Sequence, residues 1–311
     1  MIGTTRILEK QNLLQMSQVL FRCPRMANAF TIDTNAFVLT VNGAGIVNTS
    51  GKAQTIDNIS GTIEFLGISS AGSTTIINFA QIAGGGFFGL TTFNGASTAG
   101  SATITNNGGA TISAGSGFAQ FMRTSTAGNA TIINNGGVAS GDSGGLTGFF
   151  NTSTAGSATI ISNGGNGLGG KTEFLDSSDG GTARAIMNGN GVFDISSLST
   201  AGMGIASIER SGNYFLGSKN LSVGGNNLST TVSGVIQDGG ALTLTGANTY
   251  TGTTTVSSGA LVVSGSIASV QTVVNSGGFL GGRGTIGGNL GNNGVVAQFN
   301  SRASCESRSK L

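Results

Sequence analysis

Three acidic residues, Glu173, Asp176 and Asp179, form the only local carboxylate cluster of this 311-residue chain. Carboxylate oxygens are the ligands that calcium prefers, and a pair of carboxylates can serve as acid and base in glycoside cleavage. One interpretation is therefore a polysaccharide-active enzyme centred on these residues. The other interpretation is a solvated corner of an acidic segment, with no chemistry of its own.

Residues 141–145 read Gly-Asp-Ser-Gly-Gly, the nucleophile signature of trypsin-like serine proteases. A serine nucleophile needs a base to take its proton, normally a histidine, and the chain contains no histidine. The two cysteines, Cys23 and Cys305, lie far apart in the sequence, which argues against a zinc site. We therefore expect neither a protease triad nor a metal centre.

The motif Gly-x-Gly-x-x-Gly occurs three times, beginning at Gly84, Gly165 and Gly282. A dinucleotide site needs this motif between the strand and the helix of a βαβ unit, and no copy has that setting. In a chain with 56 glycines the motif recurs by chance. No cofactor is expected.

Binding surfaces for sugars or ice are not indicated either. Two tyrosines and no tryptophan leave few aromatic platforms for a sugar. A flat array of outward threonines would predict ice binding, but we expect no single outward column from threonines such as Thr103, Thr105 and Thr111.

The distribution of charge limits the partners of the chain. The formal net charge is +2, but residues 27–300 carry seven Lys or Arg against ten Asp or Glu, a balance of −3. Nucleic-acid binding relies on a basic surface that neutralises phosphates. The acidic body therefore predicts no nucleic-acid partner.

A repeat must position all of these residues. Near-identical phrases begin at Thr98, Thr126 and Thr154, each 28 residues after the previous one, and a weaker copy begins at Ser70. A fixed period of roughly 20–50 residues is typical of a solenoid. Within one period, short alternating runs at 101–105, 110–113 and 118–122 are separated by glycine-rich corners, which predicts three strands per coil.

Strands that recur once per coil and run the same way must pair in parallel. The predicted fold class is all-β, a right-handed parallel β-helix (solenoid) of roughly ten coils over residues 27–300, with the hand taken from the general preference for right-handed crossovers. Residues one period apart should stack as ladders. The expected ladders are Ile104, Ile132 and Ile160 in the interior, Phe65, Phe93, Phe121 and Phe149 beside them, and Asn107, Asn135 and Asn163 at a corner.

The two ends, residues 1–26 and 297–311, fit neither pattern. Arg6–Arg22 is the one stretch that could be helical, with Pro24 just beyond it. We therefore expect a short irregular or helical N-terminal segment that caps the first coil or is disordered. The polar tail at 297–311 is expected to be disordered.

The stretch 238–263 closely resembles the autotransporter-associated β-strand repeat, a module of passenger domains exported by type V secretion in Gram-negative bacteria. The likeness divides the chain into a β-helix of 28-residue repeats at 27–204 and a β-helix with this module at 205–296. The residues that carry the structural repeat motif are Leu242, Leu244, Gly246, Asn248, Thr249, Tyr250, Gly252, Val256, Gly259 and Leu261.

This resemblance implies a structural stalk, or passenger fragment, that supports export and folding and is not an enzyme. It implies a location at the cell surface or outer membrane, or secretion from the cell. The implied partners are the chain's own C-terminal outer-membrane barrel and the outer-membrane assembly machinery. An adhesive role toward a host or cell-surface ligand is compatible with it.

Two further expectations concern the ends of the chain. No cleavable signal peptide is recognised in Met1–Phe21 and no barrel of alternating strands follows residue 296. We therefore expect a truncated product, which without export would stay in the cytoplasm. The unpaired edges of the terminal coils predict end-to-end self-association. The alternative function remains the polysaccharide-active enzyme with the Glu173/Asp176/Asp179 cluster.

Overall fold

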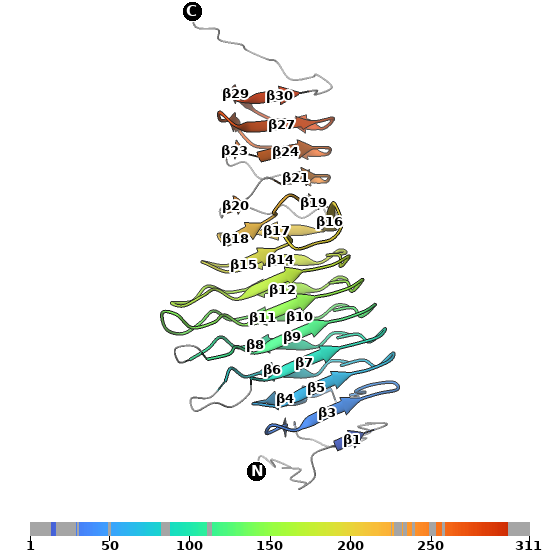
Figure 1. Cartoon of the computed structure of the whole chain (residues 1–311). Coiled ribbons are helices and arrows are strands. Elements are labelled where there is room, and N and C mark those ends of the chain that lie inside the picture. The colour runs from blue at the N-terminus through green and yellow to red at the C-terminus, as the bar shows by residue number, and fades with distance from the viewer. Residues whose placement is uncertain are drawn as a thin grey trace, which may run out of the picture.

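The computed structural model describes residues 14–16, 29, 31–48, 51–81, 88–110, 114–224, 226, 232, 235–237, 240–248, 253–256 and 259–297. Within these residues the chain forms strands, turns and bends but no helix. The strands pair in parallel, and successive coils stack along one axis from the N-terminal to the C-terminal end (Figure 1). The predicted all-β fold, a parallel β-helix, is confirmed.

Two long sheets form two sides of the stack, and each coil of the N-terminal part contributes one strand to each. Sheet A contains, in order, β1 (Leu14–Met16), β3 (Val38–Val41), β5 (Thr62–Phe65), β7 (Leu90–Phe93), β9 (Phe118–Phe121), β11 (Leu146–Phe149), β13 (Lys171–Phe174), β15 (Val192–Asp194), β18 (Asn213–Phe215) and β20 (Val235–Gln237). Sheet B contains β2 (Thr31–Asp33), β4 (Thr55–Asn58), β6 (Thr75–Asn78), β8 (Thr103–Asn106), β10 (Thr131–Asn134), β12 (Thr159–Ser162), β14 (Arg184–Met187) and β17 (Ser207–Glu209).

The third side begins as a line of single bridges, one residue per coil, through Gly45, Ser70, Thr98, Thr126, Thr154 and Asp179. A hydrogen bond from Gly204 N to Asp179 Oδ2 (3.2 Å) joins this line to a wider sheet. That sheet, sheet C, contains β16 (Gly202–Ile205), β19 (Asn220–Val223), β21 (Ala241–Leu244), β24 (Gly259–Val263), β27 (Gly278–Gly282) and β30 (Val295–Ala297).

Two three-stranded sheets complete the C-terminal coils in place of sheets A and B. One contains β22 (Ala247–Asn248), β25 (Ser266–Ile267) and β28 (Thr285–Ile286). The other contains β23 (Thr254–Val256), β26 (Gln271–Val274) and β29 (Asn289–Asn292).

The strand predicted at the middle of each period is wrong. Residues 138–140 form a bend and a turn, and of the equivalent 110–113 only Ala110, a bend, is described. The reason is close backbone packing between glycine-rich corners. A Cβ atom on Gly136 would lie 2.4 Å from Gly165 N, and one on Gly137 would lie 2.5 Å from Asp142 O. The line of bridges forms the third side instead.

The N-terminal segment also differs from the expected helix. Leu14–Met16 form β1, whose backbone pairs in parallel with Leu39–Val41 of β3. This pairing adds a strand to the edge of sheet A. Residues 1–13, 17–26 and 298–311 lie outside the described residues.

The coils shorten toward the C-terminus. Thr131 pairs with Thr159, an offset of 159 − 131 = 28 residues, whereas Leu242 pairs with Leu261, an offset of 261 − 242 = 19 residues. The stack is correspondingly narrower at its C-terminal end (Figure 1). Ten strands of sheet A agree with the roughly ten coils expected, and the short coils of β24, β27 and β30 follow them.

The predicted aromatic ladder is confirmed and is longer than expected. Its first five rings stack nearly parallel, with centroids 4.7–4.8 Å apart and interplanar angles of 4–11°. Two tilted rings continue the column. The fully buried members are Phe65, Phe93, Phe121, Phe149, Phe174, Phe193 and Tyr214. Beside them, the predicted column of Ile104, Ile132 and Ile160 is paired in register and fully buried.

The corner ladder of asparagines is confirmed as well. Asn135 Nδ2 donates to Asn107 Oδ1 (3.1 Å) and Asn163 Nδ2 donates to Asn135 Oδ1 (3.0 Å). Asn188 extends the ladder by donating to Asn163 Oδ1 (2.9 Å). Each amide therefore satisfies the amide of a neighbouring coil.

A second asparagine ladder, which the sequence reasoning missed, lies inside the stack at the ends of the sheet B strands. Asn78 Nδ2 donates to Asn106 Oδ1 (2.7 Å) and Asn106 Nδ2 donates to Asn134 Oδ1 (2.8 Å). The Thr147 hydroxyl donates to Asn134 Oδ1 (2.7 Å), so the ladder also joins sheet A. These side chains are fully buried, and their mutual hydrogen bonds offset the cost of removing them from water.

Candidate functional site

The three carboxylates of the candidate enzyme site have separate sets of partners. Glu173, on β13, forms an ion pair with Lys171 (2.8 Å). Asp176 accepts hydrogen bonds from Asn151 N (2.8 Å) and Nδ2 (3.2 Å) in the preceding coil. Asp179 accepts one from Gly181 N (2.7 Å) in its own turn.

The part of the chain that the structure describes contains no group of three His, Cys, Asp or Glu side chains placed to hold a metal ion. The cluster that is compact in sequence is therefore not compact in space. Each of its carboxylates instead contributes to the packing of neighbouring coils.

The ion pairs on the outer face of sheet A fix the charge of their members. Burial acts to lower the pKa of Lys171, but hydrogen bonds to Glu173 and Asp194 outweigh burial and the pKa of Lys171 is raised. Burial acts to raise the pKa of Asp194, but hydrogen bonds from Ser196 and Lys171 outweigh burial and the pKa of Asp194 is lowered. Lys171 lies 3.0 Å from Asp194, so one ammonium links adjacent coils.

The protease-like motif is a packed corner of the repeat. Asp142 is fully buried, and its Oδ2 accepts a hydrogen bond from Ala139 N (2.8 Å). The carbonyl of Ser143 accepts from Gly109 N (2.7 Å) of the preceding coil, and the carbonyl of Asp142 accepts from Leu168 N (2.9 Å) of the next. The motif therefore links three successive coils through its backbone.

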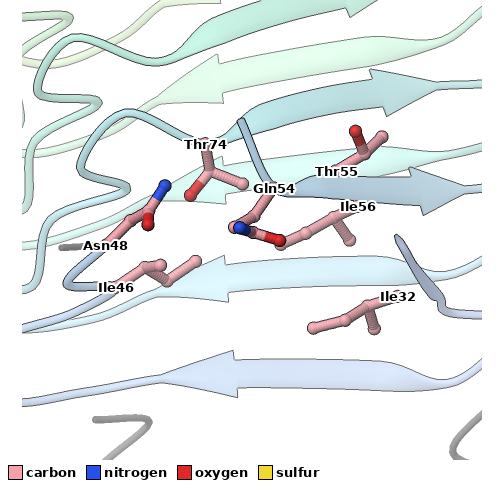
Figure 2. A pocket seen from close by; sticks show the side chains of 7 residues that line it. All are labelled: Ile32, Ile46, Asn48, Gln54, Thr55, Ile56 and Thr74. Carbon is pink, nitrogen blue, oxygen red and sulfur yellow. The ribbon is translucent and has the colours of Figure 1, made fainter. Parts of the chain in front are cut away.

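A small cavity lies near the N-terminal end, between β2, β4 and the corner before β6 (Figure 2). Its volume suits about one water molecule, too small for an organic substrate. The Thr74 hydroxyl is buried there without a hydrogen-bond partner. The lining residues are Ile32, Ile46, Asn48, Gln54, Thr55, Ile56 and Thr74.

The repeat motif of the C-terminal part supplies interior side chains to successive coils. Leu242 pairs with Leu221 on one side and with Leu261 on the other, and Leu261 pairs with Leu280. Leu261 and Leu280 are buried, and Leu242 packs against the same core. Leu244 on β21 and Val256 on β23 are buried too. The motif's apolar residues therefore build a continuous core.

The polar and glycine residues of the motif form the corners. A Cβ atom on Gly246 would lie 2.3 Å from the Gly224 carbonyl oxygen, so only glycine fits there. Asn248 Nδ2 donates to Gly246 O (2.9 Å) and to Ser266 O (3.1 Å), which joins one coil to the next. Gly259 has a φ of 72°, in the left-handed region that glycine favours. Thr249, Tyr250 and Gly252 lie outside the described residues.

The outer face of sheet B contradicts the expectation about threonines. The first residue of each strand is Thr55, Thr75, Thr103, Thr131 or Thr159, and these residues are paired in strict register as one outward column. The signal that could have found them is the Thr-Ile phrase at a 28-residue spacing, once the middle strand is discarded. Thr105 lies on the same face as Thr103, whereas Thr111 lies outside the described residues.

No helix of the described part of the chain is long and apolar enough to cross a membrane. No curated protein and no solved structure gives a significant match to the chain. A family model, the passenger-associated-transport-repeat, matches residues 237–263. This match covers β21–β24 and contains all ten residues of the predicted motif. Residues 237–263 are therefore a passenger-associated transport repeat, the β-strand repeat of autotransporter passengers.

Proposed function

We propose that this chain is a rigid stalk of an autotransporter passenger, which supports export and folding and is carried at the cell surface or secreted. The observation that carries the proposal is the transport repeat at residues 237–263, whose coil continues the core of the β-helix. Its export partners would be an outer-membrane translocator and the outer-membrane assembly machinery. The stalk acts by its shape and stiffness rather than by catalysis.

The separate engagement of Glu173, Asp176 and Asp179 supports a role without catalysis. Acid and base catalysis needs carboxylates that face a common substrate. Here Glu173 faces Lys171, and the other two carboxylates accept backbone hydrogen bonds. A broad panel of glycans incubated with the purified chain should show no cleavage, and cleavage lost on Asp176→Asn would contradict this part.

The export role can be tested on the full chain fused between a signal peptide and an outer-membrane translocator. Leu261→Asp puts a charge into the repeat's core, whereas Val262→Asp changes the adjacent, half-buried residue of β24. We expect Leu261→Asp to reduce the amount of folded chain accessible to protease on intact cells several-fold. Val262→Asp should leave that amount nearly unchanged, and equal effects of the two substitutions would contradict the proposal.

An adhesive role is favoured by the outer face of sheet A. Leu90, Phe118 and Leu146 pair in register there and are only half-buried. Gly148 makes room for aromatic rings, since a Cβ atom on it would lie 2.6 Å from Phe150 Cε2 and 3.4 Å from Phe118 Cε2. Contiguous apolar surface of this kind is typical of interaction sites.

Binding of the labelled chain to cultured host cells tests the adhesive role. The double variant Phe118→Ser, Leu146→Ser should lower the bound signal several-fold, because it removes the apolar contact area. The matched double variant Thr103→Ser, Thr131→Ser, on the outer face of sheet B, should not lower it. Absence of binding by the unmodified chain would remove the adhesive part and leave the stalk proposal standing.

A further inference from the structure

The outer face of sheet B carries a flat, uncharged grid over four coils. Strands β6, β8, β10 and β12 read Thr-Ile-Ile-Asn, Thr-Ile-Thr-Asn, Thr-Ile-Ile-Asn and Thr-Ile-Ile-Ser. Their second and fourth residues are buried, so the first and third residues face outward. The outward grid therefore has one column of four threonines and one column of Ile77, Thr105, Ile133 and Ile161.

A third column runs along the edge of this grid. Ser73, Ser101, Asn129 and Ser157 stand two residues before the threonine of each strand and are exposed. Each coil thus presents a small polar residue, a threonine and an isoleucine or threonine. All charged side chains of sheet B lie beyond the four coils, with Asp57 at one end and the Arg184–Glu209 ion pair at the other.

The spacing of the grid follows from strand geometry. Neighbouring strands lie about 4.8 Å apart, and outward residues of one strand lie about 6.6 Å apart. Because the register is unbroken from Thr75 to Thr159, the hydroxyl groups repeat at the first spacing along the axis. Both spacings are close to repeats of water oxygens on the faces of hexagonal ice.

The grid is also held rigidly. Directly behind it lie the fully buried Ile76, Ile104, Ile132 and Ile160 column and the hydrogen-bonded Asn78, Asn106 and Asn134 ladder. The threonine hydroxyls of the grid have no hydrogen-bond partner among the described protein groups and are free to bind water. The methyl groups of threonine and isoleucine order the water between the hydroxyls.

We propose that the outer face of β6, β8, β10 and β12 binds ordered water and, through it, the surface of ice. The hydroxyl column anchors a row of water molecules at the ice repeat, and the apolar column beside it prevents those waters from being disordered by charged groups. The binding chemistry is a lattice match over an area, so single hydroxyls contribute little and steric interruption of the grid removes the effect. This function is independent of the export role proposed above.

The test is thermal hysteresis and ice-crystal shaping by the purified full chain. Thr131→Tyr and Thr103→Lys each interrupt the grid, whereas Gln120→Lys and Thr62→Tyr place equal bulk on the outer face of sheet A. Circular dichroism and the unfolding midpoint of each variant verify that the fold is retained. A milder variant, Thr131→Val, keeps the shape and methyl groups and removes only one hydroxyl.

We expect the unmodified chain to facet ice crystals and to show thermal hysteresis that falls several-fold in Thr131→Tyr and Thr103→Lys. The sheet A variants should retain the full effect, and Thr131→Val should retain most of it. A chain without thermal hysteresis or crystal shaping would overturn the proposal. So would an effect that sheet A variants reduce as much as sheet B variants.

Discussion

Phe121 shows how one residue is used repeatedly in this protein. Its ring lies 4.7 Å from that of Phe93 and 4.8 Å from that of Phe149, with both neighbours nearly parallel to it. Stacked aromatic pairs contribute about 0.5–1.5 kcal/mol beyond the area they bury. Each ring of the column therefore stabilises two interfaces between coils.

Replacing Phe121 by alanine should strongly destabilise the central coils. The substitution creates a cavity and breaks both stacked contacts, for which we expect a loss of about 3–5 kcal/mol in the free energy of unfolding. Phe118, at the outer face of the same strand, provides the control. Phe118→Ala should cost much less in urea denaturation, and similar losses for both variants would contradict the assigned burial.

The lowered pKa of Asp194 predicts a pH dependence of stability. A carboxylate whose folded-state pKa lies below its ordinary value of 3.8 stabilises the fold when ionised. This contribution is fully present above the ordinary pKa and is lost as the pH falls through the lower folded-state value. Unfolding midpoints of the chain and of Asp194→Asn, measured from neutral pH down into this range, should converge at the acid end. Curves that stay parallel throughout would contradict the prediction.

At the scale of the element, the unit of the structure is one strand stacked on its equivalent in the next coil. The residues at strand ends decide how closely two coils approach. At Gly246 the approach leaves no space for a side chain, because the Gly224 carbonyl oxygen lies on one side and the backbone of Gly265 lies on the other. The glycines of the transport repeat are therefore contact residues in their own right.

Gly246→Ala should destabilise the C-terminal coils locally. The added methyl group would meet a backbone oxygen at 2.3 Å, which only a backbone shift can relieve. Gly204→Ala is the matched control, since a Cβ atom there has no neighbour within 4 Å. Amide hydrogen exchange of residues 241–263 should be accelerated several-fold in the first variant only. Acceleration by both variants would show that the packing does not discriminate between them.

The elements also show what sequence could predict. Alternation and the 28-residue spacing predicted the strands of sheets A and B and the phenylalanine ladder, because inward side chains repeat at that period. The same alternation at 138–140 predicted a strand that is absent, since glycine backbone contacts replace side-chain packing there. Asn106 was read as a corner residue, because an isolated asparagine before Asn-Gly gives no sign of a buried partner in the next coil.

Of the candidate site, the transport repeat was predictable in full because its residues are contiguous. The carboxylate cluster was not, because proximity in sequence does not bring side chains together at a corner. Asp176 turns back to Asn151 and Asp179 to its own turn. The threonine grid was missed for the opposite reason, since its members are far apart in sequence and meet only through stacking.

For the whole molecule, stability is distributed between neighbouring coils rather than gathered in one core. Repeat proteins of this kind open from their ends. We expect amide protons of β7, β9 and β11 to exchange slowest with solvent and those of β29 and β30 to exchange fastest. The last coil already exposes its apolar side chains, with Leu290 37% and Val295 58% exposed. Hydrogen exchange followed by mass spectrometry measures this gradient, and uniform protection along the stack would contradict it.

The identical register of consecutive periods has a consequence for the gene. Thr75 pairs with Thr103 in the same way that Thr103 pairs with Thr131, so excision of one period would bring Thr75 against Thr131 with the same neighbours. DNA that encodes near-copies in tandem recombines unequally. The stalk can therefore become longer or shorter by whole turns between lineages, and each new length folds by contacts that the parent already possessed.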